Sequence, residues 1–184
     1  MIIGFQGIKN SFNDYATDEF IKKIKIKSKK LPLVTSKNVA NSLINRKIDF
    51  GVIALKNNIS GTVEESEKIL KSNFFEIIDT IEMKINHCLF AFDEKSSKNL
   101  KVIVSHPHAL KQCERYLKLN FPNCEFQEYI DTAKTAEDLK SGILKKSVGI
   151  ICSEKAGKEN GLYLVSKNIS NIVSKTTFGL IKLI

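Results

Sequence analysis

Short apolar runs and amphipathic stretches follow one another along the whole chain. Apolar runs of strand length occur at residues 1–7, 31–36, 48–55, 101–105, 124–130, 147–152, 162–169 and 176–184. The stretches between them space their apolar residues as helices do, and we expect helices at 13–27, 38–47, 63–73, 107–120, 132–143 and 153–160. Ser36 or Asn38 is the expected cap of the second helix, and Gly161 is the expected stop of the last one.

Residues 74–92 interrupt this rhythm, because they predict two long strands, or one long crossing strand, without a helix. Repeated strand–helix units predict an α/β fold with mixed, mostly parallel sheets. We therefore expect two lobes. The first comprises residues 1–82 plus 165–184, and the second, inserted lobe comprises residues 83–164. Ligands of such folds bind at the carboxyl ends of strands, beside helix N-termini.

The composition is that of a globular protein, with 42% hydrophobic and 27% charged residues among 184. No apolar run approaches the roughly 20 residues that span a bilayer, and no basic leader precedes the first strand. We therefore expect a cytoplasmic protein with no membrane partner. The four cysteines form no C-x-x-C pair, so they are expected to be reduced, mostly buried and not zinc ligands.

The net charge of +9 raises nucleic-acid binding as one explanation. The basic residues are diffuse, however, apart from residues 21–30, and they lack interleaved aromatic residues. A solvated lysine-rich surface that attracts a small anionic substrate explains the charge better, so no nucleic-acid partner is expected.

The stretch "SHPHALKQC", residues 105–113, contains the densest group of reactive side chains. His106 and His108 stand two apart, which does not place both rings on one helical face, and no third zinc ligand is evident. Cys113 within a helix is more often a packing residue than a nucleophile. His87, on an apolar strand, is expected to be a hydrogen-bonded core histidine.

Several motifs in order along the chain resemble the catalytic domain of prephenate dehydratase. They are "GFQGIKNSFNDYA", "DFGVIALKNNISGTV", "INHCLFAF", "VSHPHALKQC", "DTAKTA" and "SKTTFGLI". The fourth, similar to Ser-His-Pro-Gln-Ala-Leu-x-Gln-Cys, is the most specific. The resemblance covers nearly the whole chain.

The resemblance implies a two-lobed fold like that of periplasmic binding proteins, with the site in the cleft between the lobes. It implies a lyase that converts prephenate to phenylpyruvate in phenylalanine biosynthesis, with no cofactor and no metal. It also implies a homo-oligomer, which we expect to be a dimer. Family enzymes often continue into an ACT domain, which we do not expect on this chain.

Residue by residue, the resemblance assigns a catalytic role to Thr176, whose hydroxyl would bond the leaving oxygen. Asn57 would orient a substrate hydroxyl or carboxylate. Further substrate-binding positions match Ser11, Ser105, Gln112, Thr132 and Phe178. Ser105 and Thr132 each precede or begin a helix, where backbone N–H groups favour an anion.

The sequence departs from the family pattern at five positions. Thr177 replaces an arginine and Lys56 a glutamate. Asn10 replaces a glycine, and Asn58 and Asp131 each replace a serine. We hypothesise that the family's glutamate and arginine face each other across the cleft, and that Lys56 here restores a positive charge toward the substrate. The alternative function is a relative that binds prephenate or another carboxylate without dehydrating it, as a decarboxylase or an inactive binder.

Overall fold

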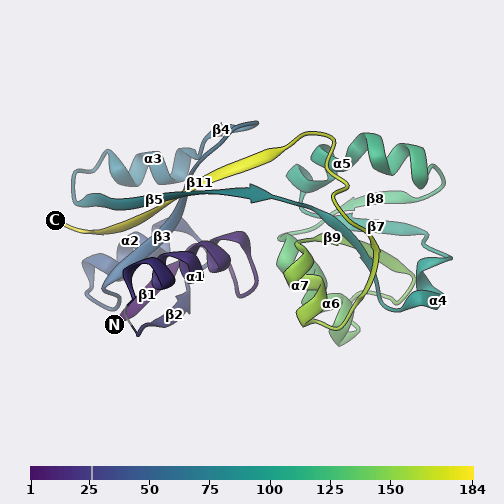
Figure 1. Cartoon of the computed structure of the whole chain (residues 1–184), viewed down its shortest axis with the longest axis horizontal. Coiled ribbons are helices and arrows are strands. Elements are labelled where there is room, and N and C mark those ends of the chain that lie inside the picture. The colour runs from purple at the N-terminus through teal and green to yellow at the C-terminus, as the bar shows by residue number, and fades with distance from the viewer. Residues whose placement is uncertain (26) are drawn as a thin grey trace. The chain divides into compact units, whose positions relative to one another are not determined.

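The computed structural model describes residues 1–25 and 27–184, which divide into two compact units (Figure 1). Unit 1 comprises Met1–Lys84 and Ser174–Ile184, and unit 2 comprises Ile85–Val173. The boundaries lie two and nine residues later than the expected ends at 82 and 164. The second difference arises because residues 163–166 form a strand that pairs inside unit 2.

The sheet of unit 1 has the strand order β2-β1-β3-β11-β5, with β4 paired to β3. Its strands are β1 (Ile2–Phe5), β2 (Lys29–Pro32), β3 (Phe50–Asn57), β4 (Gly61–Thr62), β5 (Phe75–Ile85) and β11 (Ser174–Leu183). β1 runs parallel to β2 and β3, whereas β11 and β4 run antiparallel to β3. The sheet is therefore mixed, and its antiparallel share is larger than expected because the C-terminal strand enters next to β3.

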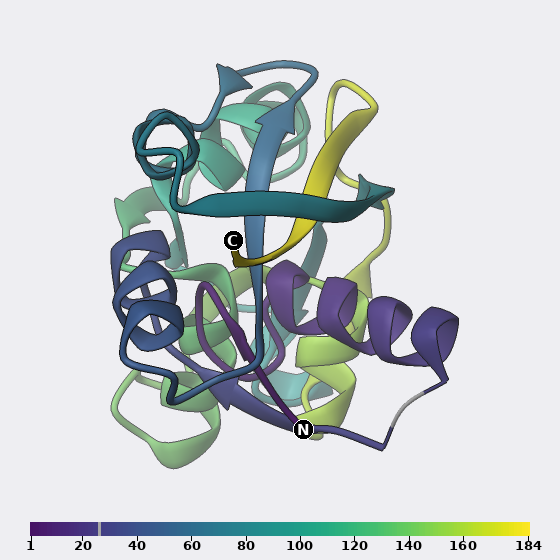
Figure 2. The ribbon, with the colours of Figure 1, turned by 90° about the vertical axis from the view of Figure 1, so that its left-hand side faces the viewer.

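Helices α1 (Phe12–Ile24), α2 (Ser36–Ile44) and α3 (Glu64–Leu70) cover this sheet. Figure 2 shows α1 and α2 on opposite sides of it. On the α2 side, the core contains Val39, Leu43, Ile53, Phe75 and Ile181. Alternate residues of β3 and β11 therefore point to different layers, as the two-residue period of a strand requires.

Unit 2 is built on a sheet of order β10-β6-β9-β7-β8. Its strands are β6 (Cys88–Ala91), β7 (Val102–Ser105), β8 (Glu125–Glu128), β9 (Val148–Cys152) and β10 (Tyr163–Ser166). Its helices are α4 (Glu94–Ser97), α5 (Pro107–Asn120), α6 (Thr132–Ser141) and α7 (Glu154–Glu159). β7 pairs in parallel with β8 and β9, and β6 pairs antiparallel with β9 and β10. The second sheet is mixed as well.

Several expected boundaries are wrong in detail. The strand expected at 31–36 is Lys29–Pro32, and Thr35 rather than Ser36 or Asn38 caps α2 by accepting from the Asn38 N–H. The chain leaves the strand early because Val34 has a φ of 65° and exchanges two backbone hydrogen bonds with Gly7.

Helix α1 also ends earlier than the expected residue 27, at Ile24, with Lys25 in the left-handed conformation. The part of that expectation that concerns Ile26 lies outside the described residues. Residues 74–92 form two strands, β5 and β6, and Gly161 follows α7 with a φ of 62°, as expected of a stop residue. Among the described residues, no helix combines the length and the apolar character that crossing a membrane requires.

Candidate functional site

Thr176 and Asn57 lie directly opposite each other on β11 and β3. The Asn57 Nδ2 group donates a hydrogen bond to Thr176 Oγ1 over 2.8 Å. Thr176 is 9% exposed and so belongs to the buried polar residues. The antiparallel pairing of the C-terminal strand with β3 thus brings together two residues 119 positions apart in the sequence.

The Asn57 amide makes three further hydrogen bonds. Its Oδ1 accepts from the backbone N–H groups of Ile59 and Ser60, at 2.9 and 3.2 Å. Its Nδ2 also donates to the hydroxyl of Ser174, at 3.0 Å. Since backbone N–H groups can only donate, the oxygen and nitrogen of this amide are assigned without ambiguity.

This orientation decides which way the Thr176 hydroxyl proton points. Because Thr176 Oγ1 accepts from Asn57, its own proton is directed to another partner. Within residues 1–25 and 27–184, no group accepts that proton. The arrangement therefore leaves the Thr176 hydroxyl proton available for a further hydrogen bond.

Sequence reasoning missed Ser174, which is fully buried and completes this cluster. The signal was present, because Ser174 precedes Thr176 by two residues on one strand and so shares its face. What the sequence did not show was the register that places Asn57 beside both hydroxyls.

Lys56 and Thr177 are also register partners, on adjacent strands of unit 1. The hypothesis that these positions face each other across a cleft is therefore wrong, although they do neighbour each other. Successive side chains of a strand alternate between faces, so this pair points away from the face that holds Asn57 and Thr176. The exposed Lys56 is not brought to the Thr176 hydroxyl.

Two other residues expected to bind substrate have structural roles. Ser11 caps α1 by accepting from the Asp14 N–H, and Phe178 is enclosed in the core at 1% exposed. Phe178 lies two residues after Thr176 on β11, so both side chains point to the same face of the sheet, where Phe178 is part of the core. Asn10, at the family's glycine position, has a φ of 66°, and its N–H donates to Asp14.

In unit 2, Ser105 is at the expected strand end, but its hydroxyl is fully buried and donates to the Ile151 carbonyl over 2.7 Å. That bond uses the hydroxyl proton, and the binding of an anion at Ser105 stays a prediction. Ser105 ties β7 to the neighbouring strand β9.

Thr132 is the first residue of α6, and Asp131 is its cap. The Asp131 carboxylate accepts from the N–H groups of Ala133 and Lys134, at 2.7 and 3.1 Å. A carboxylate of the chain itself thus occupies the helix N-terminus that Thr132 was expected to offer to an anion, and repels another negative charge. The replacement of the family's serine by Asp131 has this electrostatic consequence.

Gln112, on α5, lies against the buried His87, with Oε1 3.1 Å from His87 Nε2. His87 is 4% exposed, and burial lowers its pKa to about 4, so the ring is neutral at physiological pH. A neutral ring that donates to Oε1 leaves the Nε2 hydrogens of the half-buried Gln112 directed elsewhere. His87 is therefore the hydrogen-bonded core histidine that was expected.

The remaining reactive side chains of residues 105–113 pack rather than coordinate. His106 caps α5, and its ring stacks on that of His108 at 5.4 Å between centroids. No cluster of potential metal ligands occurs in the described part of the chain. Cys113 is fully buried, and burial raises the pKa of its thiol to about 12, so a thiolate nucleophile is disfavoured.

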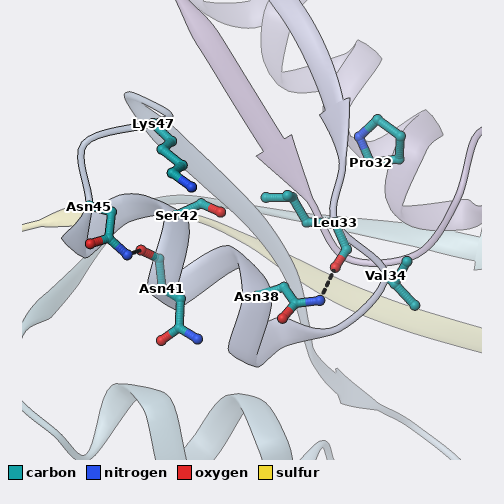
Figure 3. A pocket seen from close by; sticks show the side chains of 8 residues that line it. All are labelled: Pro32, Leu33, Val34, Asn38, Asn41, Ser42, Asn45 and Lys47. Carbon is teal, nitrogen blue, oxygen red and sulfur yellow. Dashed lines mark hydrogen bonds between the residues drawn. The ribbon is translucent and has the colours of Figure 1, made fainter.

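A separate polar pocket of about 310 Å³ lies beside α2 in unit 1 (Figure 3). Asn38, Asn41, Ser42 and Asn45 line it from the helix, and Pro32–Val34 line it from the other side. Asn38 is held by the Leu33 carbonyl over 2.9 Å. None of the predicted site residues lines this pocket.

Similarity to known proteins is consistent along the chain. A family model described as prephenate dehydratase matches residues 3–182. The bifunctional chorismate mutase/prephenate dehydratase of Buchnera aphidicola (subsp. Schizaphis graminum) is 30% identical over 170 residues, 91% of this chain and 43% of that protein. Arogenate dehydratase/prephenate dehydratase 1 of Arabidopsis thaliana, described as chloroplastic, is 28% identical over 71% of this chain and 32% of its own length. The chain thus spans less than half of each of these relatives.

Solved structures share the fold. A prephenate dehydratase from Arthrobacter aurescens in complex with L-Phe superposes with a TM-score of 0.88 at 19% identity, over 100% of this chain and 61% of that one. A protein described as a quorum-quenching acylase superposes with a TM-score of 0.81 at 20% identity, over 100% of this chain and 64% of that one. These likenesses confirm the expected α/β fold class. With residues 3–182 matched by the family model, the chain belongs to the prephenate dehydratase family.

Proposed function

We propose that this chain catalyses the decarboxylating dehydration of prephenate to phenylpyruvate in phenylalanine biosynthesis. The observation that carries the proposal is the Thr176 hydroxyl, held as a donor by Asn57. Family membership supports the reaction class.

The chemistry requires one proton donor and no redox partner. The bond from the ring to the carboxylate breaks and releases CO₂, and its electron pair completes the aromatic ring. The ring–hydroxyl bond breaks at the opposite carbon, and the departing hydroxide takes a proton to leave as water. Thr176 donates to that oxygen, as a proton donor or as a conduit from water. A positioned proton transfer of this kind contributes roughly 10²–10⁴ in rate.

The other polar groups assist in binding. Gln112 offers its amide N–H groups to a substrate oxygen, because its carbonyl oxygen lies against His87. The net charge of +9 attracts the dianionic substrate. Ser11 and Phe178 act as supports of the fold rather than as substrate ligands.

The test is prephenate turnover, followed by the absorbance of phenylpyruvate in alkali. The wild-type protein is expected to form product, and Thr176→Ala to lower kcat by about 100-fold or more. Thr176→Ser, which keeps the hydroxyl, should lose about tenfold or less. Thr62→Ala, the same truncation at an exposed threonine of β4, is the matched control and should stay within twofold of wild type. Wild-type protein that forms no phenylpyruvate from prephenate would refute the proposal.

A second candidate is a relative that binds the substrate without dehydrating it. The departures from the family pattern at Lys56 and Thr177 raised this alternative, and the Asp131 carboxylate, which occupies the N-terminus of α6 in place of the family's serine, supports it. Stabilisation of the protein by prephenate in a thermal melt, with no phenylpyruvate formed, would identify this function.

We further propose a cytoplasmic protein that forms a homodimer. Four free cysteines fit a reducing compartment. The exposed Ile44 and Phe74 border an apolar groove of about 370 Å³ between α2 and α3, which suits a protein interface. Light scattering after size-exclusion chromatography tests the dimer, and a monomer at micromolar concentration would overturn it.

A further inference from the structure

We propose that Asn57 is a positioning residue that sets the direction of the Thr176 proton, with Ser174 as its anchor, and that it does not bind the substrate itself. This inference rests on the proposed function, since it assigns Thr176 the role of donor in that reaction. It replaces the role of substrate ligand that the sequence suggested for Asn57.

The hydrogen bonds of Asn57 leave no place for a substrate atom. A side-chain amide has two donor hydrogens and two acceptor lone pairs. The two hydrogens go to Ser174 Oγ and Thr176 Oγ1, and the two lone pairs take the N–H groups of Ile59 and Ser60. The full capacity of the amide is used within the chain.

Ser174 restricts the rotation of this amide. Its side chain is fully buried at the start of β11, on the same face as Thr176. With the turn N–H groups holding one end and Ser174 the other, the second Nδ2 hydrogen is aimed at Thr176. The Thr176 oxygen is then always an acceptor on this side, and its proton points to the reacting group.

The sharpest test reverses the polarity of this contact with the near-isosteric change Asn57→Asp. The new carboxylate still accepts from the turn, but it presents an oxygen to Thr176 where the amide presented a hydrogen. The Thr176 proton is then donated to residue 57 instead of the substrate. We expect kcat for prephenate near pH 8 to fall at least about 100-fold, with KM within about twofold of wild type.

The pH dependence of the Asp variant distinguishes this role from a structural one. A protonated carboxyl group can donate to Thr176 again, so kcat of the variant should rise relative to wild type as the pH is lowered. A single protonation predicts about a tenfold rise per pH unit between pH 8.5 and 6, after subtraction of the rate without enzyme. Asn58→Asp, the same change at the neighbouring exposed residue, should follow the wild-type profile. A flat relative profile for Asn57→Asp, or a raised KM with unchanged kcat, would overturn the inference.

A second arm examines the contact without relying on turnover. The side-chain amide resonances of Asn57 are identified as those lost in Asn57→Asp. In the wild-type protein their hydrogens should exchange with water at least about tenfold more slowly than those of the exposed Asn41, and Ser174→Ala should accelerate this exchange. If the wild-type chain does not turn over prephenate, the proposed function fails and this arm decides the inference alone. Exchange as fast as that of Asn41 would refute the inference even in an active enzyme.

Discussion

Lys56 and Thr177 stand opposite each other on β3 and β11, one position along from the pair of Asn57 and Thr176. Both residues depart from the family pattern, a glutamate and an arginine respectively. Opposite charges at such cross-strand positions stabilise a sheet by roughly 0.2–1 kcal/mol, and like charges destabilise it. Because the two positions are cross-strand neighbours, we expect the loss of one family residue to be offset by the loss of the other.

A double-mutant cycle tests this coupling. Thr177→Arg alone places an arginine beside Lys56 and should lower the free energy of unfolding. The double change Lys56→Glu with Thr177→Arg should be more stable than the sum of the single changes by about 0.5 kcal/mol. Urea denaturation measures all four proteins, and additive effects would show that the positions are independent. Turnover per folded molecule should change less than about threefold, because the pair lies on the face away from Thr176.

His87 predicts a loss of stability in acid. Burial lowers its pKa from 6.5 to about 4 in the folded chain, so between these values the unfolded chain binds a proton that the folded chain does not. Stability from this group is therefore present above pH 6.5 and is lost as the pH falls toward 4, by about 3 kcal/mol in total.

The measurement compares urea unfolding at pH 7.5 and 4.5 for the wild-type protein and for His87→Gln. The variant should be less stable at pH 7.5. Its free energy of unfolding should, however, fall by about 2–3 kcal/mol less than that of the wild-type protein between pH 7.5 and 4.5. His106, whose pKa burial also lowers, is retained in both proteins and cancels in the comparison. An equal drop in both proteins would contradict the prediction.

The cap of α6 predicts a graded series at residue 131. Asp131→Ala removes the acceptor of two backbone N–H groups and should cost about 1 kcal/mol of unfolding free energy. Asp131→Asn retains an oxygen acceptor and should cost a few tenths of a kcal/mol. Equal losses in the two variants would mean that the charge, and not the hydrogen bond, stabilises the helix start.

The cysteines should differ in their reactivity toward iodoacetamide. Burial raises the thiol pKa of all four cysteines, but Cys88, Cys113 and Cys152 are buried, whereas Cys124 is half-buried and within reach of a reagent. Mass spectrometry of the native protein should show one alkylated site, at Cys124, and Cys124→Ser should abolish it. Labelling of Cys113 in the folded protein would restore the interpretation of this residue as a nucleophile.

The sequence by itself determined much of the local structure and the fold class of this protein. The periodicity of apolar residues identified the main helices and strands, since buried positions recur about every 3.6 residues in a helix and every two residues in a strand. The resemblance of ordered motifs identified Thr176 and Asn57 as neighbours in function. Cys113 and His87 were correctly expected in the core, since a cysteine within a helix is usually a packing residue and His87 lies on an apolar strand.

Only the tertiary structure decided which polar groups cooperate, because hydrogen-bond partners are set by strand register between distant segments. Register placed Ser174 beside Asn57 and sent Lys56 to the opposite face, and a shift of one residue would have exchanged these outcomes. In the same way, the hydroxyl of Ser105 donates to the carbonyl of Ile151, a residue 46 positions away in the sequence. The spacing of residues along one strand predicts which side chains share a face of the sheet. The register with the neighbouring strand decides which hydrogen-bond partners those side chains meet.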